Sequence, residues 1–420
     1  MPDDAALDLC AFVDAAPSAF HACAEAARRL GGGGFVELAE HAAWPTAPGG
    51  YFLRRGGSLL AWRHADVAPA TGFRVLAAHT DSPNLRVKPQ PDLARSGWQQ
   101  LAVEVYGAPL WNSWLDRDLG LSGQVAVRTP TGVETRLVRV DDPVLRVPQL
   151  AIHLDRDSNT SLALNPQQHL TPVWGVGTSP RSFRSWLGEL VESSDVLAWT
   201  LMTHDLTASR LIGAARDLVA APRLDNLATC HAGVSALLAA APPRLTPVLA
   251  LFDHEEVGSE SDRGAQSTLL TSTLERVVLC RGGARDDLFR ALAATVVASG
   301  DMAHATHPNY PERHDPQHQV AVNGGPVLKT NAKLRYATDP TGAATFRLAC
   351  DQAGVPLQQF VARNDMPCGS TVGPMTAART GATTVDFGAP MLSMHSAREL
   401  CGAKDPAMYA AALTAFLDPA

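Results

Sequence analysis

Five polar motifs, far apart in the chain, contain side chains that commonly bind divalent metal ions. They are His79-Thr80-Asp81, Leu224-Asp225-Asn226, Glu255-Glu256, Asp301 in Ser299-Gly300-Asp301-Met302, and His395 in Met394-His395-Ser396. Two imidazoles and several carboxylates are the donors that zinc and similar ions prefer in proteins. One ion with an open position needs three protein ligands, whereas five ligands suffice for two ions if one carboxylate is shared. The combination predicts a pair of ions about 3.5–4 Å apart, an arrangement suited to hydrolysis.

The adjacent carboxylates of Glu255 and Glu256 predict two different roles. They follow the apolar run Pro247–Phe252, where neighbouring carboxylates are costly unless a cation neutralises them. A metal ion would satisfy one of them, and the other could act as a general base toward a metal-bound water. Each motif alone has an ordinary alternative: a structural histidine, an Asp-Asn turn or a solvated pair of glutamates. Their combination favours the metal centre.

The composition is that of a globular protein without features of nucleic-acid or membrane binding. The 420 residues are 46% hydrophobic and 18% charged, and the formal net charge is −7. The chain has no Lys/Arg-rich run and no apolar run of roughly 20 residues, so we expect no nucleic-acid partner and no membrane span. The N-terminus lacks a signal-peptide pattern, and the cysteines form no CxxC pair. These features favour a cytoplasmic protein with reduced thiols.

Apolar runs that precede polar motifs predict buried strands. These runs are Phe73–Ala78 and Pro247–Phe252, and Thr383–Phe387 is expected to be another short strand. Helices are expected over residues 5–30, with an interruption at Pro17, and over 230–241 and 287–297. Ser396 and Glu399 have the spacing of a capping box, which predicts a further helix after them. The succession favours an α/β fold with a mixed or mostly parallel central sheet, helices on both faces, and an active site at the carboxyl ends of the strands.

A central part of the chain has a different pattern. Apolar and polar residues alternate between Gly and Pro turns, as in Leu101–Tyr106 and Gln124–Arg128, which is typical of antiparallel strands. We therefore expect a discontinuous catalytic domain, residues 1–86 and 220–420, interrupted by a β-rich domain, residues 87–219. Within the latter, alternating spacing predicts His153 to be a strand residue that faces solvent.

In order and in detail, the motifs resemble those of the aspartyl aminopeptidases, metallopeptidase family M18. The matching segments are Ala78–Pro83, Pro222–Asn226, Glu255–Ser259, Asp301–Ala305, Arg363–Gly369 and Met394–Glu399. They extend over most of the chain, and together they are far more specific than any one alone. The resemblance implies a phosphorylase/hydrolase-like catalytic domain interrupted by a β-rich dimerisation and lid domain. It also implies homo-oligomers, typically tetrahedral dodecamers built from dimers.

The resemblance further implies a role for each residue of the predicted centre. The implied ligands are His79 and Asp301 for one ion, Glu256 and His395 for the other, and Asp225 as the bridge between them. Glu255 resembles the general base that activates a metal-bridging water, and Asp81 resembles the carboxylate that orients the imidazole of His79. Two divalent ions per subunit are implied, with Zn²⁺ expected and Co²⁺ or Mn²⁺ compatible with the same ligands.

The implied activity is removal of the N-terminal residue from peptides, with Asp or Glu preferred. His153 resembles a histidine that reaches the active site of a neighbouring subunit. Lys329 and, shortly after it, Tyr336 lie in a segment that resembles the family's substrate-binding stretch. Lys329 could pair with the acidic side chain of the substrate, or it could simply cap a strand at the surface. In the latter case Arg335 is the next candidate for that role.

Two alternative functions stay open. The first is a related metallo-aminopeptidase of neutral or broad specificity, because related families share the His-x-Asp, Asp-Asn and Glu-Glu motifs; the segment Arg363–Gly369 favours the aspartyl enzymes. The second is a non-catalytic assembly protein with the same fold. The presence of all five ligands and of the base argues against it.

Overall fold

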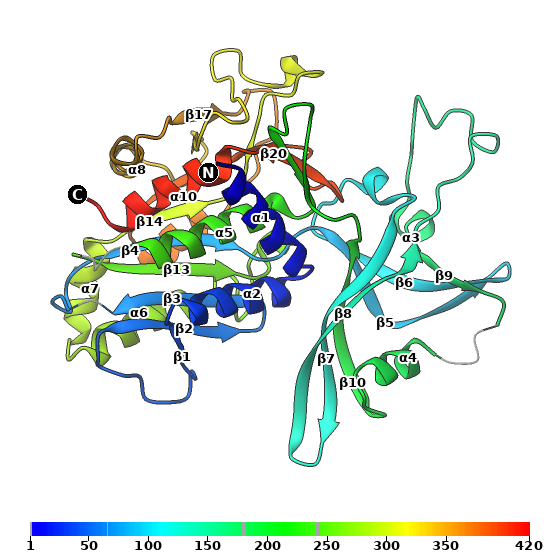
Figure 1. Ribbon diagram of the computed structural model, residues 1–420, viewed down its shortest axis with the longest axis horizontal. Coiled ribbons are helices and arrows are strands. Elements are labelled where there is room, and N and C mark those ends of the chain that lie inside the picture. The colour runs from blue at the N-terminus through cyan, green and yellow to red at the C-terminus, as the bar shows by residue number, and fades with distance from the viewer. Residues whose placement is uncertain (1, 65, 179–181, 241–243) are drawn as a thin grey trace. The chain divides into compact units, whose positions relative to one another are not determined.

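The computed structural model describes residues 2–64, 66–178, 182–240 and 244–420, and the chain forms two compact units (Figure 1). The first unit comprises Met1–Asp81, Ser209–Met394 and Glu399–Ala420, and the second comprises Ser82–Ala208 and His395–Arg398. The insert thus begins before residue 87 and ends before residue 219. It does so because its first strand already starts at Asn84, while the strand Leu218–Ala221 pairs within the first unit.

A nine-stranded sheet forms the centre of the first unit. Its strands, in spatial order, are β1 (Val36–Glu37), β2 (Gly49–Arg55), β3 (Ser58–His64), β13 (Thr246–Phe252), β4 (Phe73–His79), β14 (Val296–Gly300), β18 (Thr383–Gly388), β16 (Val327–Thr330) and β17 (Gln358–Val361). The four central strands, from β13 to β18, run parallel, whereas β3 and β16 pair antiparallel with them. The predicted mixed α/β sheet is therefore confirmed.

The central strands are buried on both faces, and this accounts for the mostly apolar sequences of β4 and β13. Every residue of β13 is buried, and β4 is buried except at Arg74. Side chains alternate between two cores: Leu76 and Ala78 of β4 join one, whereas Val75 and Ala77 join the other. The period of two follows from the pleat of the strand.

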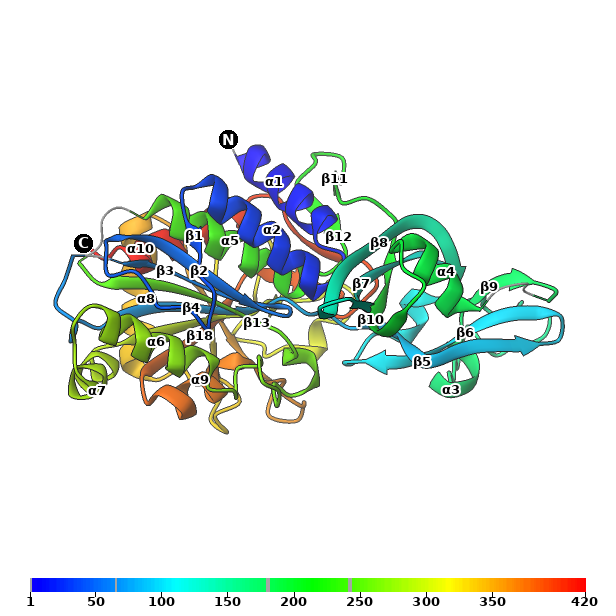
Figure 2. The same ribbon diagram turned by 90° about the horizontal axis from the view of Figure 1, so that it is seen from below.

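Helices cover both faces of the sheet (Figure 2). One core contains residues of α1 (Pro2–Ala15), α2 (Ala19–Gly32), α5 (Leu224–Ala239), α8 (Pro340–Ala353) and α10 (Asp405–Leu417). The opposite core contains residues of α6 (Leu269–Cys280), α7 (Arg285–Ala293) and α9 (Val372–Thr380). None of the helices in the described part of the chain has both the length and the apolarity that a membrane span requires.

A smaller sheet in the first unit corrects one of the predicted helices. Its order is β11 (Arg210–Ile212), β12 (Leu218–Ala221), β20 (Glu399–Gly402), β19 (Pro390–Leu392) and β15 (Ala303–His304). Glu399 begins strand β20, so the helix predicted after Ser396 is wrong: pairing with β12 and β19 determines the conformation there. Similarly, the helix predicted over 287–297 ends at Ala293, because the next residues form the buried strand β14.

The second unit is built around a closed six-stranded sheet. The strand order is β10 (Val196–Asp205), β5 (Asn84–Arg95), β6 (Trp98–Tyr106), β9 (Val173–Val176), β8 (Gly132–Arg146) and β7 (Asp118–Thr129). The short helices η1 (Trp111–Trp114), α3 (Pro166–His169) and α4 (Phe183–Leu190) complete it. Alternate residues such as Leu121, Val125 and Val127 of β7 point into its core, as the sequence pattern predicts.

Candidate metal centre

The ends of three neighbouring parallel strands carry most of the predicted ligands. Strand β4 ends at His79, and the chain beyond β13 and β14 continues to Glu255 and Asp301. Because β4 lies between the other two strands, these residues meet at one carboxyl edge of the sheet. Asp225 comes from the start of α5. Its peptide bond to Asn226 is cis, and the Asn226 side-chain amide donates to the last carbonyl of β14 at 2.8 Å.

His79 lies at the centre of a group of carboxylates in the first unit. Its Nε2 atom is 3.3 Å from Oδ1 of Asp225, 3.8 Å from Oδ1 of Asp301 and 4.0 Å from Oε2 of Glu255. The potential ligand atoms of His79, Asp225 and Asp301 all lie within 4.8 Å of one another, as do those of His79, Glu255 and Glu256. One imidazole among carboxylates at this spacing is a donor set that fits a divalent ion such as zinc.

The electrostatics of this group also favour a cation. Burial lowers the pKa of His79, but hydrogen bonds with Asp225, Asp301 and Asp81 outweigh it and hold this pKa well above its usual value. Burial raises the pKa of the Glu255 carboxyl to about 8; the charge of His79 opposes this rise, and the nearby carboxylates add to it. Both shifts reflect an excess of negative charge in a poorly solvated place. A divalent cation would neutralise that charge and favour the ionised carboxylates.

Asp81 connects the histidine to the pair of glutamates. The Nδ1 of His79 donates to the main-chain oxygen of Asp81 at 3.0 Å, and the carboxylate Oδ1 of Asp81 is 3.5 Å from the same nitrogen. The two carboxylate oxygens accept the backbone N–H groups of Glu255 and Glu256, both at 3.1 Å. The main chain of Asp81 thus contacts the imidazole and its carboxylate holds the backbone of both glutamates, while the role of the carboxylate in orienting the imidazole stays a prediction.

Backbone carbonyls also determine which ring nitrogens can bind a metal. The oxygen of Asp81 accepts from Nδ1 of His79, and within the second unit the oxygen of Ala108 lies 3.0 Å from Nδ1 of His395. A carbonyl oxygen can only accept, so Nδ1 carries a proton in both rings, which leaves Nε2 as the nitrogen that a metal ion could bind. His395 belongs to the segment His395–Arg398, which groups with the second unit. Its role as a ligand stays a prediction.

Lys329 is buried beside the carboxylates. Its side chain, on β16, is 2% exposed, so the alternative of a cap on the protein surface is wrong. The ammonium donates to the main-chain oxygen of Met302 at 3.2 Å and lies 3.9 Å from Oδ2 of Asp301. It also lies 5.0 Å from the centroid of the Tyr336 ring, within cation–π distance. The structure thus brings Lys329 and Tyr336 to Asp301.

His153 lies elsewhere, in the second unit. The sequence predicts a strand there, but residues 152–154 form a turn, so this prediction is wrong. Three apolar side chains around the exposed His153 are solvent-accessible: Leu150 is 56% exposed, Ile152 44% and Leu154 75%. An alternating sequence adopts strand geometry only where a neighbouring strand offers hydrogen bonds, and none pairs with this segment among the described residues.

Glu399 is a residue of the centre that the sequence reasoning missed. It is 3% exposed, and its Oε2 accepts the backbone N–H of Asp225 at 3.0 Å. The carboxylate thereby holds the segment that presents Asp225. The interval between Ser396 and Glu399 favours a helix cap, and only the position of β20 reveals this contact. Its place within the motif Met394–Glu399 is the one sequence signal that pointed to the centre.

Comparisons with known proteins match nearly the whole chain to one family. A family model described as aminopeptidase I zinc metalloprotease (M18) matches residues 12–417. A protein of Mycobacterium leprae (strain TN), named probable M18 family aminopeptidase 2, is 57% identical over 422 residues, which cover 99% of each chain.

Solved structures resemble the whole chain as well. A chain in the cryo-EM structure of the Ape4 and Nbr1 complex is 36% identical, with a TM-score of 0.95 over 99% of this chain and 86% of that chain. A chain of the S. cerevisiae mApe1 dodecamer is 26% identical, with a TM-score of 0.86 over 99% of this chain and 96% of that chain.

Proposed function

Because the chain belongs to the M18 family of zinc metallo-aminopeptidases, we propose that it is a two-metal enzyme that removes N-terminal Asp or Glu from peptides. The observation that carries the proposal is the convergence of His79, Asp225, Asp301 and the two glutamates at one sheet edge. The ions, when bound, polarise the peptide carbonyl and make water a better nucleophile near neutral pH.

Each residue of the proposed centre has its own role, either as a metal ligand or as the general base. In this proposal His79 and Asp301 would hold one ion, Glu256 and His395 would hold the other, and Asp225 would be shared between them. Glu255 is not needed as a ligand, so its carboxylate is available to take a proton from the attacking water and to return it to the leaving amine. The backbone hydrogen bonds from Glu255 and Glu256 to Asp81 support this division, because they keep the two adjacent carboxylates in a fixed relation.

The preference for an acidic first residue rests on Lys329. A buried ammonium 3.9 Å from the carboxylate of a proposed ligand is close to where the first residue of a peptide would bind. The net charge of −7 repels acidic substrates at long range, so a local cation must compensate for it. The ring of Tyr336 limits the movement of Lys329. We therefore assign the side-chain carboxylate of the substrate to the Lys329 ammonium.

Assembly is the proposed role of the second unit. The turn around His153 exposes Leu150, Ile152 and Leu154, and clustered exposed apolar side chains are typical of protein interfaces. We propose a homo-oligomer, a dodecamer built from dimers as the related mApe1 structure is a dodecamer, in which His153 completes the active site of a neighbouring subunit.

Kinetics and metal content together test the function. Purified protein is assayed with Asp-, Glu-, Ala- and Leu-linked chromogenic substrates, and its metal content is measured by elemental analysis. We expect two ions per subunit and a kcat/KM for Asp or Glu well above that for Ala or Leu. Glu255→Gln should keep the metals and lose about 100- to 10,000-fold in kcat, because an amide cannot accept the proton. Glu260→Gln, at an exposed glutamate nearby, is the matched control.

Each alternative has its own outcome. Equal activity on acidic and neutral substrates would favour the aminopeptidase of broad specificity over the aspartyl enzyme. A protein that binds metal but hydrolyses none of the substrates would favour the assembly function. Near-normal activity of Glu255→Gln would contradict the assignment of the base while leaving the substrate preference intact.

A further inference from the structure

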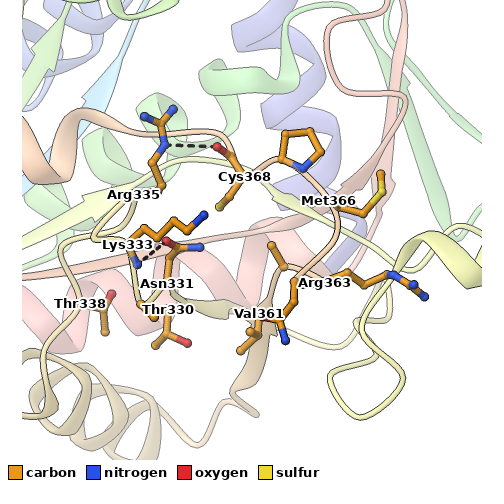
Figure 3. A pocket seen from close by; sticks show the side chains of 13 residues that line it. Thr330, Asn331, Lys333, Arg335, Thr338, Val361, Arg363, Met366 and Cys368 are labelled. Carbon is orange, nitrogen blue, oxygen red and sulfur yellow. Dashed lines mark hydrogen bonds between the residues drawn. The ribbon is translucent and has the colours of Figure 1, made fainter.

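A cavity of about 710 Å³ opens beside the ends of β16 and β17 in the first unit (Figure 3). The two strands are parallel neighbours, with Thr330 paired to Val361, so the segments that follow them leave the sheet at the same edge. Residues 330–338 form one wall of the cavity, and residues 361–368 form the other. The carboxyl ends of parallel strands are where α/β sheets bind ligands, yet none of the proposed metal ligands lines this cavity among the described residues.

The charge of the cavity is positive. Its lining includes Lys333, Arg335 and Arg363, and the described residues contribute no Asp or Glu to it. The guanidinium of Arg363 is already engaged by the carboxylate of Asp365 at 2.7 Å. Within the part of the chain that the structure describes, no carboxylate forms an ion pair with Lys333 or Arg335. Two cations are thus available to an anion from outside, in a chain whose net charge is −7.

Main-chain hydrogen bonds hold this cationic wall in place. The Nε of Arg335 donates to the main-chain oxygen of Cys368 at 3.2 Å, across the cavity mouth from one segment to the other (Figure 3). The hydroxyl of Ser370 donates to the main-chain oxygen of Arg335 at 3.2 Å, and the side-chain oxygen of Asn331 accepts the backbone N–H of Lys333 at 2.9 Å. A guanidinium anchored through Nε keeps its terminal N–H groups for a planar anion such as a carboxylate.

The cavity adjoins the residues assigned to the first position of the substrate. Thr330 follows Lys329 in the chain, and Arg335 precedes Tyr336. The same short segment therefore carries the proposed specificity lysine on its inner side and the cationic wall on its outer side. We therefore expect a peptide whose first residue binds Lys329 to place a later residue beside the cationic wall, where Lys333 and Arg335 lie.

We propose that this cavity binds a carboxylate of the peptide beyond the residue that is removed, so that the enzyme favours acidic peptides and not only an acidic first residue. The inference rests on the proposed aminopeptidase function. It assigns Lys333 and Arg335 to a second position of substrate recognition, separate from Lys329. A free anion, such as inorganic phosphate, would use the same chemistry and is distinguished by the experiment.

The test compares amidated peptides that share an N-terminal Asp. One peptide has only Ala after it, and the others carry a single Glu at the second, third or fourth position. For the wild-type protein we expect kcat/KM to be about 1.4- to 5-fold higher for at least one Glu peptide, the range for solvent-accessible ion pairs. The gain should appear in KM and not in kcat, since we expect this contact to be equally strong in the ground state and the transition state, and such uniform binding acts on KM. It should also shrink as salt is raised.

The quantity compared is the ratio of kcat/KM for a Glu peptide to kcat/KM for the peptide with only Ala after Asp. In the double variant Lys333→Gln with Arg335→Gln, this ratio should no longer exceed one. The matched control is Arg347→Gln with Lys404→Gln, which removes the same charge from two exposed side chains of the first unit and should keep the ratio. Tm values of both double variants verify folding. An equal loss on all peptides in the first variant, or a wild type indifferent to every Glu position, overturns the proposal.

Two further measurements separate the possible failures. Preference for Asp over Ala at the first residue tests the proposed function by itself, whatever happens at the cavity. Inorganic phosphate is then added to the wild-type protein as a competitor. Inhibition that is confined to the Glu peptides and lost in the Lys333/Arg335 variant supports the proposal. Binding of phosphate that needs these two residues but leaves the peptide ratio unchanged shows a free-anion site and overturns the assignment to the substrate.

Discussion

The carboxylate of Asp81 provides the sharpest test of how the centre is held together. It is 1% exposed, and its two oxygens accept the backbone N–H groups of Glu255 and Glu256 at 3.1 Å each. In Asp81→Asn one oxygen becomes an NH₂ group that faces an N–H donor. One charge-assisted hydrogen bond is lost and the other weakens. The backbone of Glu255, the proposed base, is then no longer held by the Asp81 carboxylate.

The magnitude follows from that geometry. A hydrogen bond to a charged acceptor contributes about 1.5–3 kcal/mol, which corresponds to about 10- to 150-fold in an equilibrium or rate constant. Because the bond positions the proposed base and ligand pair, we expect a fall of this size in kcat/KM at saturating zinc. Zinc affinity should also fall about 10- to 100-fold, since Asp81 is hydrogen-bonded to the proposed ligand His79. Activity is measured per folded molecule, with the folded fraction taken from thermal unfolding.

Asp405 offers a matched control in the same unit. It too is 1% exposed, and it accepts the backbone N–H groups of Asn323 at 2.7 Å and Gly325 at 3.1 Å. None of the proposed ligands is among its partners. Asp405→Asn should therefore lower Tm to a comparable extent and leave zinc affinity and kcat/KM per folded molecule within about twofold of the wild type. If the two variants lose activity equally, or if neither does, Asp81 supports the fold only and the reasoning is refuted.

Further predictions address the ligands, the substrate and the subunits. Asp225→Ala should lose metal at both sites, and full occupancy by elemental analysis would contradict the bridging role. Lys329→Leu should lower kcat/KM for Asp and Glu substrates about 10- to 100-fold and spare Ala and Leu substrates; an equal fall on both kinds would assign the lysine a structural role. His153→Ala should impair catalysis with its metals retained, and subunit exchange with Glu255→Gln should restore part of the activity; exchange without recovery would exclude a shared site. Metal loading at pH 7 should release protons from His79 and Glu255, seen by calorimetry in buffers of different ionisation enthalpy, whereas heats independent of the buffer would contradict the raised pKa values.

The sequence predicts best where local pattern and tertiary environment agree. Strands β4 and β13 are mostly apolar because they are buried on both faces, so a largely apolar segment identifies each of them. The ligand motifs follow such runs, and parallel strands bring their carboxyl ends together. The convergence of His79 with Asp301 and Glu255 is therefore a consequence that the sequence already implies.

Where partners are distant in the chain, local pattern is misleading. Glu399 has the spacing of a capping residue, but β12, from a segment far away, pairs with it and makes it a strand. Lys329 is a charged residue at the end of a short strand, a position that is usually exposed. It is buried because the oxygen of Met302 and the ring of Tyr336 provide partners that no local rule indicates. Both residues lie beside the proposed metal ligands, and contacts with distant parts of the chain determine their conformation and burial.

The balance of charge at the centre couples the proposed binding of ions to the release of protons. In the first unit, Asp225, Asp301, Glu255 and Glu256 gather around a single imidazole, and ionised they carry four negative charges. One divalent ion would neutralise two of these charges, and two ions would neutralise all four, which favours the paired centre over a single site. Without ions, protons take their place: hydrogen bonds with the carboxylates raise the pKa of His79 well above its usual value, and burial raises that of Glu255 to about 8. Binding of the ions must displace those protons, and the same displacement leaves Glu255 as a free carboxylate, the form in which a general base can act.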